Sequence, residues 1–406
     1  MKMPRLAAIA LASLFLASLG LHAQPDAASA GQPDAFGDSE ALYAVTRDLC
    51  GRDVVLLGEN GYHGDGRTMA FKVSLIQALV RRCHFNAVFF EASHYDFLEV
   101  SRRLRAGEPV TADMISSAIG AKWNRDVEMQ PLIPFLFTEA RAGRVALGGL
   151  DDQIGSLGSF YSNDRLPVEL AGYLVPIRQE PCRNLLSQRI YHGYPGQVPR
   201  SEPDYARLRA CLGDMRAGIQ SARMRDRTRR EELLEMVTNI ERNIARDLQA
   251  MTPLVIGRDH SMFLNLRWLV ARLPSRPKII IWTANAHAGN NTSINLAFRG
   301  GPNLGSQVRQ AYGASSFALA FTAGGGSFRW GDGSRPIPPA LPGSMEASVL
   351  AGHDADVVYL TPARLARLGQ IMGAAGDDHQ YVLAPWSRIY DGVIVLRSER
   401  PPTRRQ

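Results

Sequence analysis

Short apolar runs along this chain end, one after another, in polar side chains. The run Val54–Leu57 is typical of a buried strand, and Gly58 and Glu59 follow it at once. A glycine-rich segment, residues 60–66, then predicts a loop, and apolar positions at helical spacing predict a helix that begins near Thr68. Strand, polar loop and helix in this order form the opening of an α/β unit.

The same layout recurs further along the chain. Apolar runs at residues 86–90, 145–150 and 278–282 are followed by Glu91, by Asp151, and by Asn285 and His287. Further strands are predicted at residues 315–321, 357–360 and 393–396. Because ligands bind outside the carboxyl ends of parallel strands, we expect these polar groups to converge with Glu59 and His63 at one edge of one sheet. The predicted fold class is α/β, with a mostly parallel central sheet flanked by helices.

The middle of the chain breaks this alternation. Residues 155–199 are rich in Tyr, Pro and Gly and predict irregular structure, whereas residues 204–251 place apolar positions at helical spacing among many charges. We interpret residues 155–252 or so as a helical insertion that forms a lid over the cleft. The α/β domain that contains it spans residues 41–398, and a basic tail, residues 399–406, follows.

The N-terminus has the pattern of a secretory signal peptide. A basic start is followed by an apolar stretch, Leu6–Leu21, and by Ala23, a small residue suited to cleavage. The stretch is shorter than the ~20 apolar residues that a membrane-spanning helix needs. We expect residues 1–23 to be removed, residues 24–40 to be a flexible lead-in, and the mature protein to be periplasmic or secreted without a membrane segment.

The four cysteines fit an oxidising compartment. Cys50 and Cys83 each precede one of the first two predicted strands, and adjacent parallel strands start side by side, so these two are expected to pair. Cys182 and Cys211 would then pair within the middle region. No CxxC spacing occurs, so zinc-ribbon and thioredoxin interpretations are weak.

The positive charge of the chain does not point to nucleic acid. The formal net charge is +7, and arginine clusters occur at residues 223–230 and 400–405. No aromatic side chains alternate with these arginines, and export would remove the usual partner. We expect a solvated helix face and a frayed end, and no binding to nucleic acid.

Glu59 and His63 have the chemistry needed to activate water. A carboxylate beside an imidazole orients the ring and makes it more basic. The alternative is a loop histidine that simply bonds to backbone. The position of the pair at a strand end, near Glu91 and Asp151, favours the catalytic interpretation. Glu91 itself follows a buried strand and needs a positive partner, which Lys72 or a histidine could supply.

Further charged residues belong to the same region. Lys72, in the first turns of its helix, could pair with the carboxylates or stabilise an oxyanion, or it could be an ordinary surface lysine. His287 could be a second catalytic imidazole or a core histidine bonded to backbone. Arg258 and Asp259 are expected at the start of a helix, where Asp259 could serve as the cap. A cap alone would not explain Arg258 together with Asn265.

Taken in order, these segments resemble the erythromycin esterase family, which also includes proteins of unassigned role. The family's G-E-x-x-H-G motif is matched at residues 58–64 with one additional residue, for which we expect a bulge in the loop. Its basic residue nine positions after the histidine is Lys72 here. Its strand ending in Glu corresponds to residues 89–91, and its G-x-D segment to residues 149–151.

The most specific part of the resemblance lies in the second half of the chain. The family's R-D-x-x-M-x-x-N-x-x-W motif is matched in full at residues 258–268. Its W-A-H-N-x-H motif corresponds to residues 282–287, where Ala284 stands in the position of the first histidine. The resemblance spans residues 53–391 or so. A nucleophile elbow, a zincin motif, a P-loop and a G-x-G-x-x-G motif are all missing from the sequence.

The resemblance implies an exported hydrolase of small-molecule esters or macrolactones, such as erythromycin-type macrolides, with a role in antibiotic resistance. The expected catalytic residues are His63, Glu59, Glu91, Lys72 and His287. The expected substrate-binding residues are Arg258, Asp259, Asn285 and Asp151. No metal and no cofactor are expected.

Two other functions are compatible with the same residues. One is a metal-assisted hydrolase on the same fold, since the carboxylates and imidazoles are suitable ligand types, although no ligand spacing demands it. The other is a non-catalytic exported protein that binds haem or another flat hydrophobic ligand, because a related haem-binding lipoprotein group has a similar strand and G-E-x-H opening.

Overall fold

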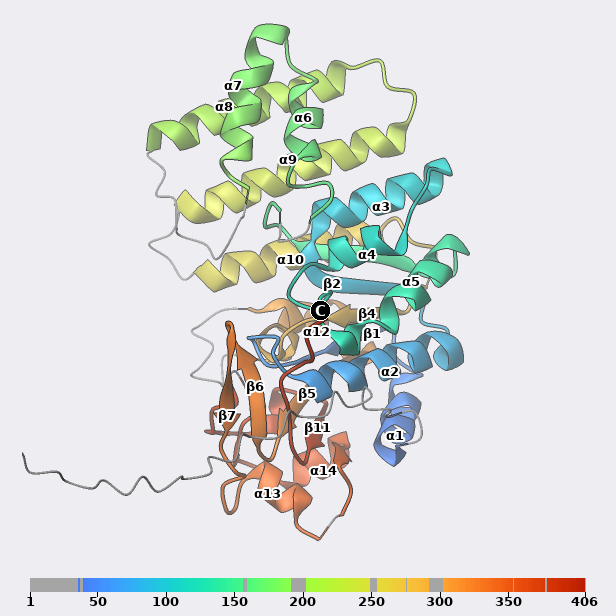
Figure 1. The fold of residues 1–406 in the computed structure, drawn as a ribbon, viewed down its shortest axis with the longest axis vertical. Coiled ribbons are helices and arrows are strands. Elements are labelled where there is room, and N and C mark those ends of the chain that lie inside the picture. Colours follow the sequence, from blue (N-terminus) through green and yellow to red (C-terminus); the bar gives the residue numbers. More distant parts are fainter. Residues whose placement is uncertain are drawn as a thin grey trace, which may run out of the picture. The chain divides into compact units, whose positions relative to one another are not determined.

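A computed structural model describes most of the chain after the predicted lead-in (Figure 1). It describes residue 36 and residues 39–155, 159–190, 202–248, 254–274, 276–291, 302–352, 354–376 and 378–405. The predicted signal peptide, residues 1–23, and nearly all of the lead-in lie outside these residues. None of the helices in the described ranges is both long enough and apolar enough to cross a bilayer.

One seven-stranded sheet organises the fold, in the order β3-β2-β4-β1-β5-β11-β8. Its strands are β1 (Val54–Leu57), β2 (Ala87–Ser93), β3 (Ala146–Asp151), β4 (Ile279–Trp282), β5 (Ser316–Ala323), β8 (Val357–Leu360) and β11 (Gly392–Leu396). All neighbouring strands run parallel except β8, which is antiparallel to β11. The α/β class with a mostly parallel central sheet is therefore confirmed.

The central strands are continuous apolar runs because helices cover both faces of the sheet. In β1, Val55 and Leu57 belong to one core, and Val54 and Leu56 belong to the other. All four side chains are fully buried. This two-sided burial explains why the strands could be predicted from sequence although they lack an alternating pattern.

The helices divide between the two faces. One core takes side chains from α1 (Glu40–Leu49), α2 (Gly66–Cys83), α4 (Ala112–Ile119) and α5 (Leu132–Arg141). The other takes side chains from α6 (Arg165–Ala171), α7 (Pro176–Ser187), α8 (Glu202–Ser221), α9 (Arg227–Leu248), α10 (Leu254–Val270) and α12 (Leu304–Tyr312). Helix α3 (His94–Ala106) contributes to both.

The shorter elements follow the same plan. Helices α13 (Met345–Leu350) and α14 (Pro362–Arg367) cover the sheet near β8 and β11, and α11 (Asn285–Ala288) follows β4 directly. Two small hairpins, β6 (Gly326–Trp330) with β7 (Gly333–Ile337) and β9 (Ile371–Gly373) with β10 (Val382–Ala384), lie outside the main sheet. The 3₁₀ turns are η1 (Val127–Met129), η2 (Gly313–Ser315) and η3 (Trp386–Arg388).

The middle region is helical, but one part of its prediction was wrong. Residues expected to be irregular contain α6 and α7: Gly172 follows α6 and Pro176 begins α7, whereas Pro181 lies inside α7. Pro is tolerated in the first turn of a helix because the amide there needs no helical partner. Figure 1 shows α6 to α9 gathered beside α3 and α10. The function of this insertion as a lid stays a prediction.

The C-terminal residues 399–405 form a strap across the protein, where a frayed end was expected. Arg400 Nη1 lies 2.6 Å from Glu128 Oε1, and Arg404 Nη1 lies 3.0 Å from Asp126 Oδ1. The backbone N–H of Val127 donates to the carbonyl oxygen of Thr403 at 2.8 Å. Arg400 and Arg404 of this C-terminal strap are therefore held by buried acidic partners, which the local sequence does not reveal.

The other arginine cluster also differs from a fully solvated face. Arg229 is 8% exposed and pairs with Glu169. Arg230 Nη2 donates to the carbonyl oxygens of Ala222 at 2.8 Å and of Met224 at 3.1 Å. These arginines hold the start of α9 against its surroundings.

Both predicted disulfides are present, but the reason given for the first was wrong. Cys50 pairs with Cys83, and Cys182 pairs with Cys211. Strand β4 lies between β1 and β2, so the two strands are not neighbours. Cys50 and Cys83 meet because the C-terminal ends of α1 and α2 come together, with Cα atoms 4.9 Å apart. Lys278 Nζ donates to the carbonyl oxygen of each cysteine.

Removing the Cys50–Cys83 bridge by a double substitution to alanine should lower the free energy of unfolding by about 3 kcal/mol, because the bridge restricts the unfolded chain. Guanidinium denaturation of the oxidised proteins would measure it. The double alanine variant at Cys182 and Cys211 is the matched control, since the two bridges span 33 and 29 positions. A loss well under 1 kcal/mol for the first variant would contradict a structural role.

Candidate functional site

The loop after β1 brings Glu59 and His63 together through unusual backbone geometry. His63 has a φ of +54°, in the left-handed region that side chains with a Cβ seldom adopt. The neighbouring Gly64 has no room for a side chain, because a Cβ there would lie 2.2 Å from the carbonyl oxygen of Arg329. The loop therefore bends tightly at His63 and Gly64.

The Glu59 carboxylate is the best-connected group of the site. Its Oε1 accepts hydrogen bonds from His63 Nδ1 at 2.7 Å, Trp123 Nε1 at 2.8 Å and Trp282 Nε1 at 3.2 Å. Its Oε2 accepts from Lys72 Nζ at 2.9 Å. Glu59 is 2% exposed and Lys72 is fully buried. A buried carboxylate with four donors is held as an anion in one orientation.

The opposite charges of Glu59 and Lys72 stabilise each other's ionised form, which burial alone would destabilise. Burial opposes ionisation of Glu59, but the Lys72 ammonium and His63 outweigh it and lower the pKa of the carboxyl. Burial lowers the pKa of Lys72 to about 8, and the Glu59 carboxylate limits that fall. The Lys72 ammonium also lies 4.0 Å from the centroid of the Trp282 ring, a favourable cation–π position.

The hydrogen bond to Glu59 sets the tautomer of His63. A carboxylate accepts, so Nδ1 of the neutral ring carries the proton and Nε2 holds the lone pair. Among the described residues, no side chain or backbone group bonds to His63 Nε2. The ring edge of Trp123, with centroids 4.9 Å apart, fixes the plane of the imidazole. His63 is thus a base with an unoccupied acceptor nitrogen.

A second group of charges lies around Arg258. Its Nη2 donates to Glu91 Oε1 at 2.8 Å and to Asp151 Oδ2 at 2.7 Å. Its Nη1 lies 3.2 Å from His287 Nε2, and His287 Nδ1 lies 2.7 Å from Asp259 Oδ1. The positive partners of Glu91 are therefore Arg258, which lies 167 positions away in the sequence, and His287, whose Nε2 lies 3.5 Å from Glu91 Oε1.

Electrostatic shifts in this second group follow from burial and from the fixed charges. Burial raises the pKa of Glu91, but His287 and Arg258 outweigh it and hold the value well below the usual range. Burial lowers the pKa of His287, but Asp259 and Glu91 outweigh it, against Arg258, and raise the value. A histidine that gains positive charge easily, beside an arginine, favours negative charge on a bound group.

Thr283 joins the two groups at the end of β4. Lys72 Nζ lies 3.5 Å from the carbonyl oxygen of Thr283, and the hydroxyl of Thr283 donates to Glu91 Oε2 at 2.8 Å. The backbone N–H of Ala284 donates to the same oxygen at 3.1 Å. The register explains this proximity, because Trp282 at the end of β4 is level with Leu57 at the end of β1 and with Phe90 in β2. Glu91, which was expected directly after a strand, follows Phe90 within β2.

Two of the expected substrate-binding residues occupy other places than the sequence suggested. Arg258 and Asp259 lie inside α10, which begins at Leu254, so the prediction that Asp259 caps its own helix was wrong. Asp259 Oδ1 accepts instead from the backbone N–H of Leu304, the first residue of α12, at 3.0 Å. The same Asp259 oxygen also bonds to His287 Nδ1.

Asn285 connects the site to β5. Its Nδ2 donates to the carbonyl oxygen of Phe321 at 2.8 Å, and its Oδ1 accepts from the N–H of Phe321 at 3.2 Å. A Cβ at Gly58 would lie 2.1 Å from this Oδ1, so the glycine leaves room for the amide. Both polar ends of Asn285 are therefore used within the protein, and its contact with substrate stays a prediction.

The C-terminal strap holds the two loops that carry the first group. Glu399 accepts from the backbone N–H of Arg67 at 2.6 Å and of Thr68 at 3.0 Å, and so caps α2. The formal N-cap residue, Asp65, makes no side-chain cap bond. Arg329 Nη2 donates to the carbonyl oxygens of His63 at 3.2 Å and of Lys122 at 3.1 Å, which ties the His63 loop to the Trp123 loop.

The sequence did not reveal Trp123 and Thr283 as site residues. The indole N–H of Trp123 reaches Glu59 from a segment 64 positions away. Thr283 lies within the family motif at residues 282–287, at the place of the motif's alanine, and its position directly after a strand was the available signal.

Replacing Trp123 with phenylalanine should lower the free energy of unfolding by about 2 kcal/mol at pH 7, because a hydrogen bond to a buried charge is lost. The pKa of Glu59 is lower in the folded state than in the unfolded state. The ionised carboxylate therefore stabilises the folded protein above about pH 4.3, and this stabilisation disappears as the pH falls through the pKa of the folded state. The loss caused by Trp123→Phe should therefore shrink in acid.

Trp386→Phe is the matched control for this measurement. Trp386 is fully buried, and its Nε1 donates to the neutral carbonyl oxygen of Ile371 at 3.0 Å. The loss of unfolding free energy caused by Trp386→Phe should not depend on pH in the same range. Urea denaturation of both variants at several pH values would show it, and equal pH dependence in the two would count against the indole bond to Glu59.

Comparison with known proteins agrees with this architecture. The erythromycin esterase family model matches residues 80–398. A solved structure of a Bacillus cereus protein is similar with a TM-score of 0.66 and 15% identity, covering 91% of this chain and 94% of that one.

Two further solved structures match over similar lengths. A succinoglycan biosynthesis protein has a TM-score of 0.63 and 16% identity, covering 91% of this chain and 93% of its own. An erythromycin esterase mutant in its open conformation has a TM-score of 0.60 and 16% identity, covering 89% and 94%. At such identities the structures establish the shared fold alone. The family model covers well over half of the sequence, and the chain therefore belongs to the erythromycin esterase family.

Proposed function

We propose that this protein hydrolyses an ester or macrolactone with a water molecule that His63 activates. The observation that carries the proposal is the 2.7 Å bond between His63 Nδ1 and Glu59, with His63 Nε2 unbonded among the described residues. Membership of the erythromycin esterase family supports a hydrolase that acts on a small molecule. The two disulfides are compatible with export to the periplasm or beyond.

In this mechanism His63 Nε2 takes a proton from water, and the hydroxide oxygen forms a bond to the ester carbonyl carbon. The carbonyl π electrons move to oxygen and give a tetrahedral oxyanion. The Glu59 carboxylate stabilises the imidazolium that forms meanwhile. The oxyanion then collapses, the bond to the alcohol oxygen breaks, and the imidazolium returns its proton to that oxygen.

The positive groups divide the remaining tasks. Lys72 is fully buried and bonded to Glu59, so its task is to keep that carboxylate ionised and oriented. Arg258 and His287 are 19% and 10% exposed at their side chains and are better placed to donate to the oxyanion. Glu91 and Asp151 hold Arg258 in place.

Ala284 sets an expectation for the rate. The family motif has a histidine at this position, whereas here only the backbone N–H reaches Glu91. General acid–base assistance contributes ~10²–10⁴ in rate, so loss of one imidazole is compatible with a slow enzyme or with a preference for a more reactive ester. We propose macrolactones as the substrate class to test first, with simple esters beside them.

His63→Ala should lower kcat by about 10²–10⁴, because the general base is removed. Purified protein would be incubated with erythromycin, other lactones and simple esters, and product would be detected as a mass gain of one water. His84→Asn is the matched control, since His84 is an exposed left-handed residue at the end of α2. The proposal fails when wild type and His63→Ala give the same background on every ester.

The rate should fall as the pH rises above about 8, because Lys72 has a pKa of about 8 and its neutral form no longer supports the Glu59 anion. Below that pH the Lys72 ammonium is present, so the decrease in rate, which forms the alkaline limb of the pH–rate profile, does not occur. In Lys72→Arg the guanidinium stays charged, so the limb should move to a higher pH even if the rate is lower. A pH–rate profile from about pH 6 to 10 would measure it. An unchanged limb in the variant would assign it to another group.

Neither alternative function gains support from the placement of these residues. Within the described ranges, no three His, Cys, Asp or Glu side chains are arranged to share a metal ion, and the Arg258 guanidinium lies between Glu91 and Asp151. Elemental analysis with a chelator control tests the metal-assisted route. Titration with haem, followed by absorbance, tests the binding protein.

A further inference from the structure

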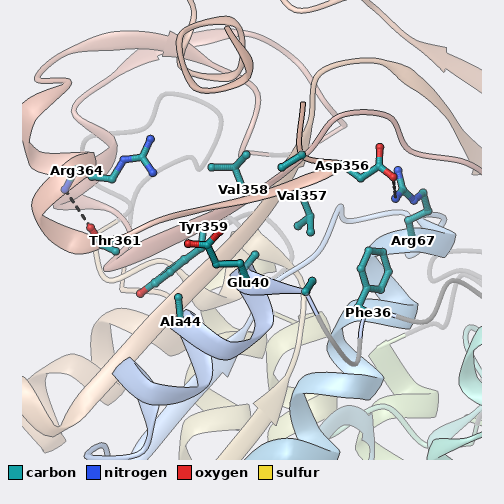
Figure 2. Close-up of a pocket in the computed structure, with 13 residues that line it drawn as sticks. Phe36, Glu40, Ala44, Arg67, Asp356, Val357, Val358, Tyr359, Thr361 and Arg364 are labelled. Atoms are coloured by element: carbon teal, nitrogen blue, oxygen red, sulfur yellow. Dashed lines mark hydrogen bonds and ion pairs between the residues drawn. The ribbon is translucent and has the colours of Figure 1, made fainter. Parts of the chain in front are cut away.

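A groove of about 630 Å³ lies between α1 and β8, away from the candidate site. Figure 2 shows α1 on one side of this edge groove and the strand on the other. Strand β8 is the last of its sheet, three places beyond β1, and no residue of the candidate site lines the groove. The edge groove is therefore a feature that ester hydrolysis does not use.

The outer edge of β8 offers unpaired backbone groups to this groove. The N–H of Arg397 donates to the carbonyl oxygen of Asp356 at 2.8 Å, and residues of an antiparallel strand alternate in the side to which they point. Val358 and Leu360 therefore bond to β11, and Val357 and Tyr359 present their N–H and C=O groups outward. Among the described residues no hydrogen bond reaches these outward groups.

The shape of the edge groove favours a single extended segment as its ligand. The side chains of Val357 and Tyr359 are only 8% and 5% exposed, so little of these side chains stands out from the strand. Ala41 and Ala44 of α1, with Phe36, form an apolar wall. An extended peptide fits between a strand edge and a helix in this way. A second folded copy fits less well, because its own helix α1 would come along with its edge strand.

Charges at the edge groove define the chemistry of such a peptide. Arg67 and Asp356 lie 3.8 Å apart at one end and face each other. Glu40, at the start of α1, and Arg364, on α14, line the groove without an ion pair among the described residues. Glu40 therefore favours a basic side chain in the occupant, and Arg364 favours a carboxylate.

We propose that the edge groove binds an extended peptide segment of a partner protein, which adds a strand to β8 and carries a basic residue for Glu40 and an acidic residue for Arg364. The main-chain groups of Val357 and Tyr359 supply two donors and two acceptors, which give affinity without regard to sequence. The apolar wall and the two charges select the sequence.

Three blocked synthetic heptapeptides with alternating Val and Thr would test the proposal on the full chain. One carries Arg at its first and Asp at its last position, the second has these charges exchanged, and the third carries Gln and Asn instead. By fluorescence anisotropy, one charged peptide should bind about tenfold more tightly than the neutral one, because two ion pairs are added. The charge order that binds gives the direction of the added strand.

Substitutions and hydrogen exchange locate the binding. Arg364→Glu should remove the preference for the charged peptide, and Arg367→Glu on the same helix is the matched control because Arg367 does not line the groove. The amides of Val357 and Tyr359 should gain protection on binding, whereas those of Val358 and Leu360 should not change.

Three results would overturn the proposal. The first is that no peptide binds or that all three bind equally. The second is that binding is unaffected by Arg364→Glu. The third is that light scattering shows a dimer of the free chain that Arg364→Glu dissociates, because this would assign the groove to a second copy.

Discussion

The ionised carboxylate of Glu59 is the constraint on which the candidate site depends. It is almost fully buried, and a buried charge is unstable unless it is bonded and balanced. Four donors from four segments meet this need: His63, Lys72, Trp123 and Trp282. Because each donor also belongs to a different part of the fold, the position of one carboxylate fixes the relative position of all four. The orientation of the His63 ring follows from this.

The architecture around the carboxylate explains how such distant donors meet. Leu57, Phe90 and Trp282 are level in β1, β2 and β4, so the residues that follow them share one edge of the sheet. The C-terminal strap then fastens the loops that leave this edge, through Glu399 at the start of α2 and through Arg404 at Asp126. The edge of the sheet supplies the groups, and the strap limits their motion relative to one another.

The use of lysine in this chain is selective. The sequence contains four lysines and 42 arginines. Lys72 fits an ammonium between the Glu59 carboxylate and the Trp282 ring, and Lys278 fits one between the carbonyl oxygens of Cys50 and Cys83. The planar guanidinium of arginine needs more space and a different donor geometry. In an arginine-rich chain, a buried lysine thus marks a place where a compact cation is required.

The sequence by itself determined the sheet, because its strands are apolar runs buried on both faces and end in polar residues. It also brought Glu59 and His63 together, since they lie four positions apart on one loop, and it identified both disulfide pairs. Only the tertiary structure decided the partners of buried charges: Arg258 for Glu91, Trp123 for Glu59, and Glu399 for the start of α2. These pairs are separated by 167, 64 and 331 positions. Local patterns report whether a side chain is buried, but the partner of a buried charge depends on which distant segments the sheet and the C-terminal strap bring to it.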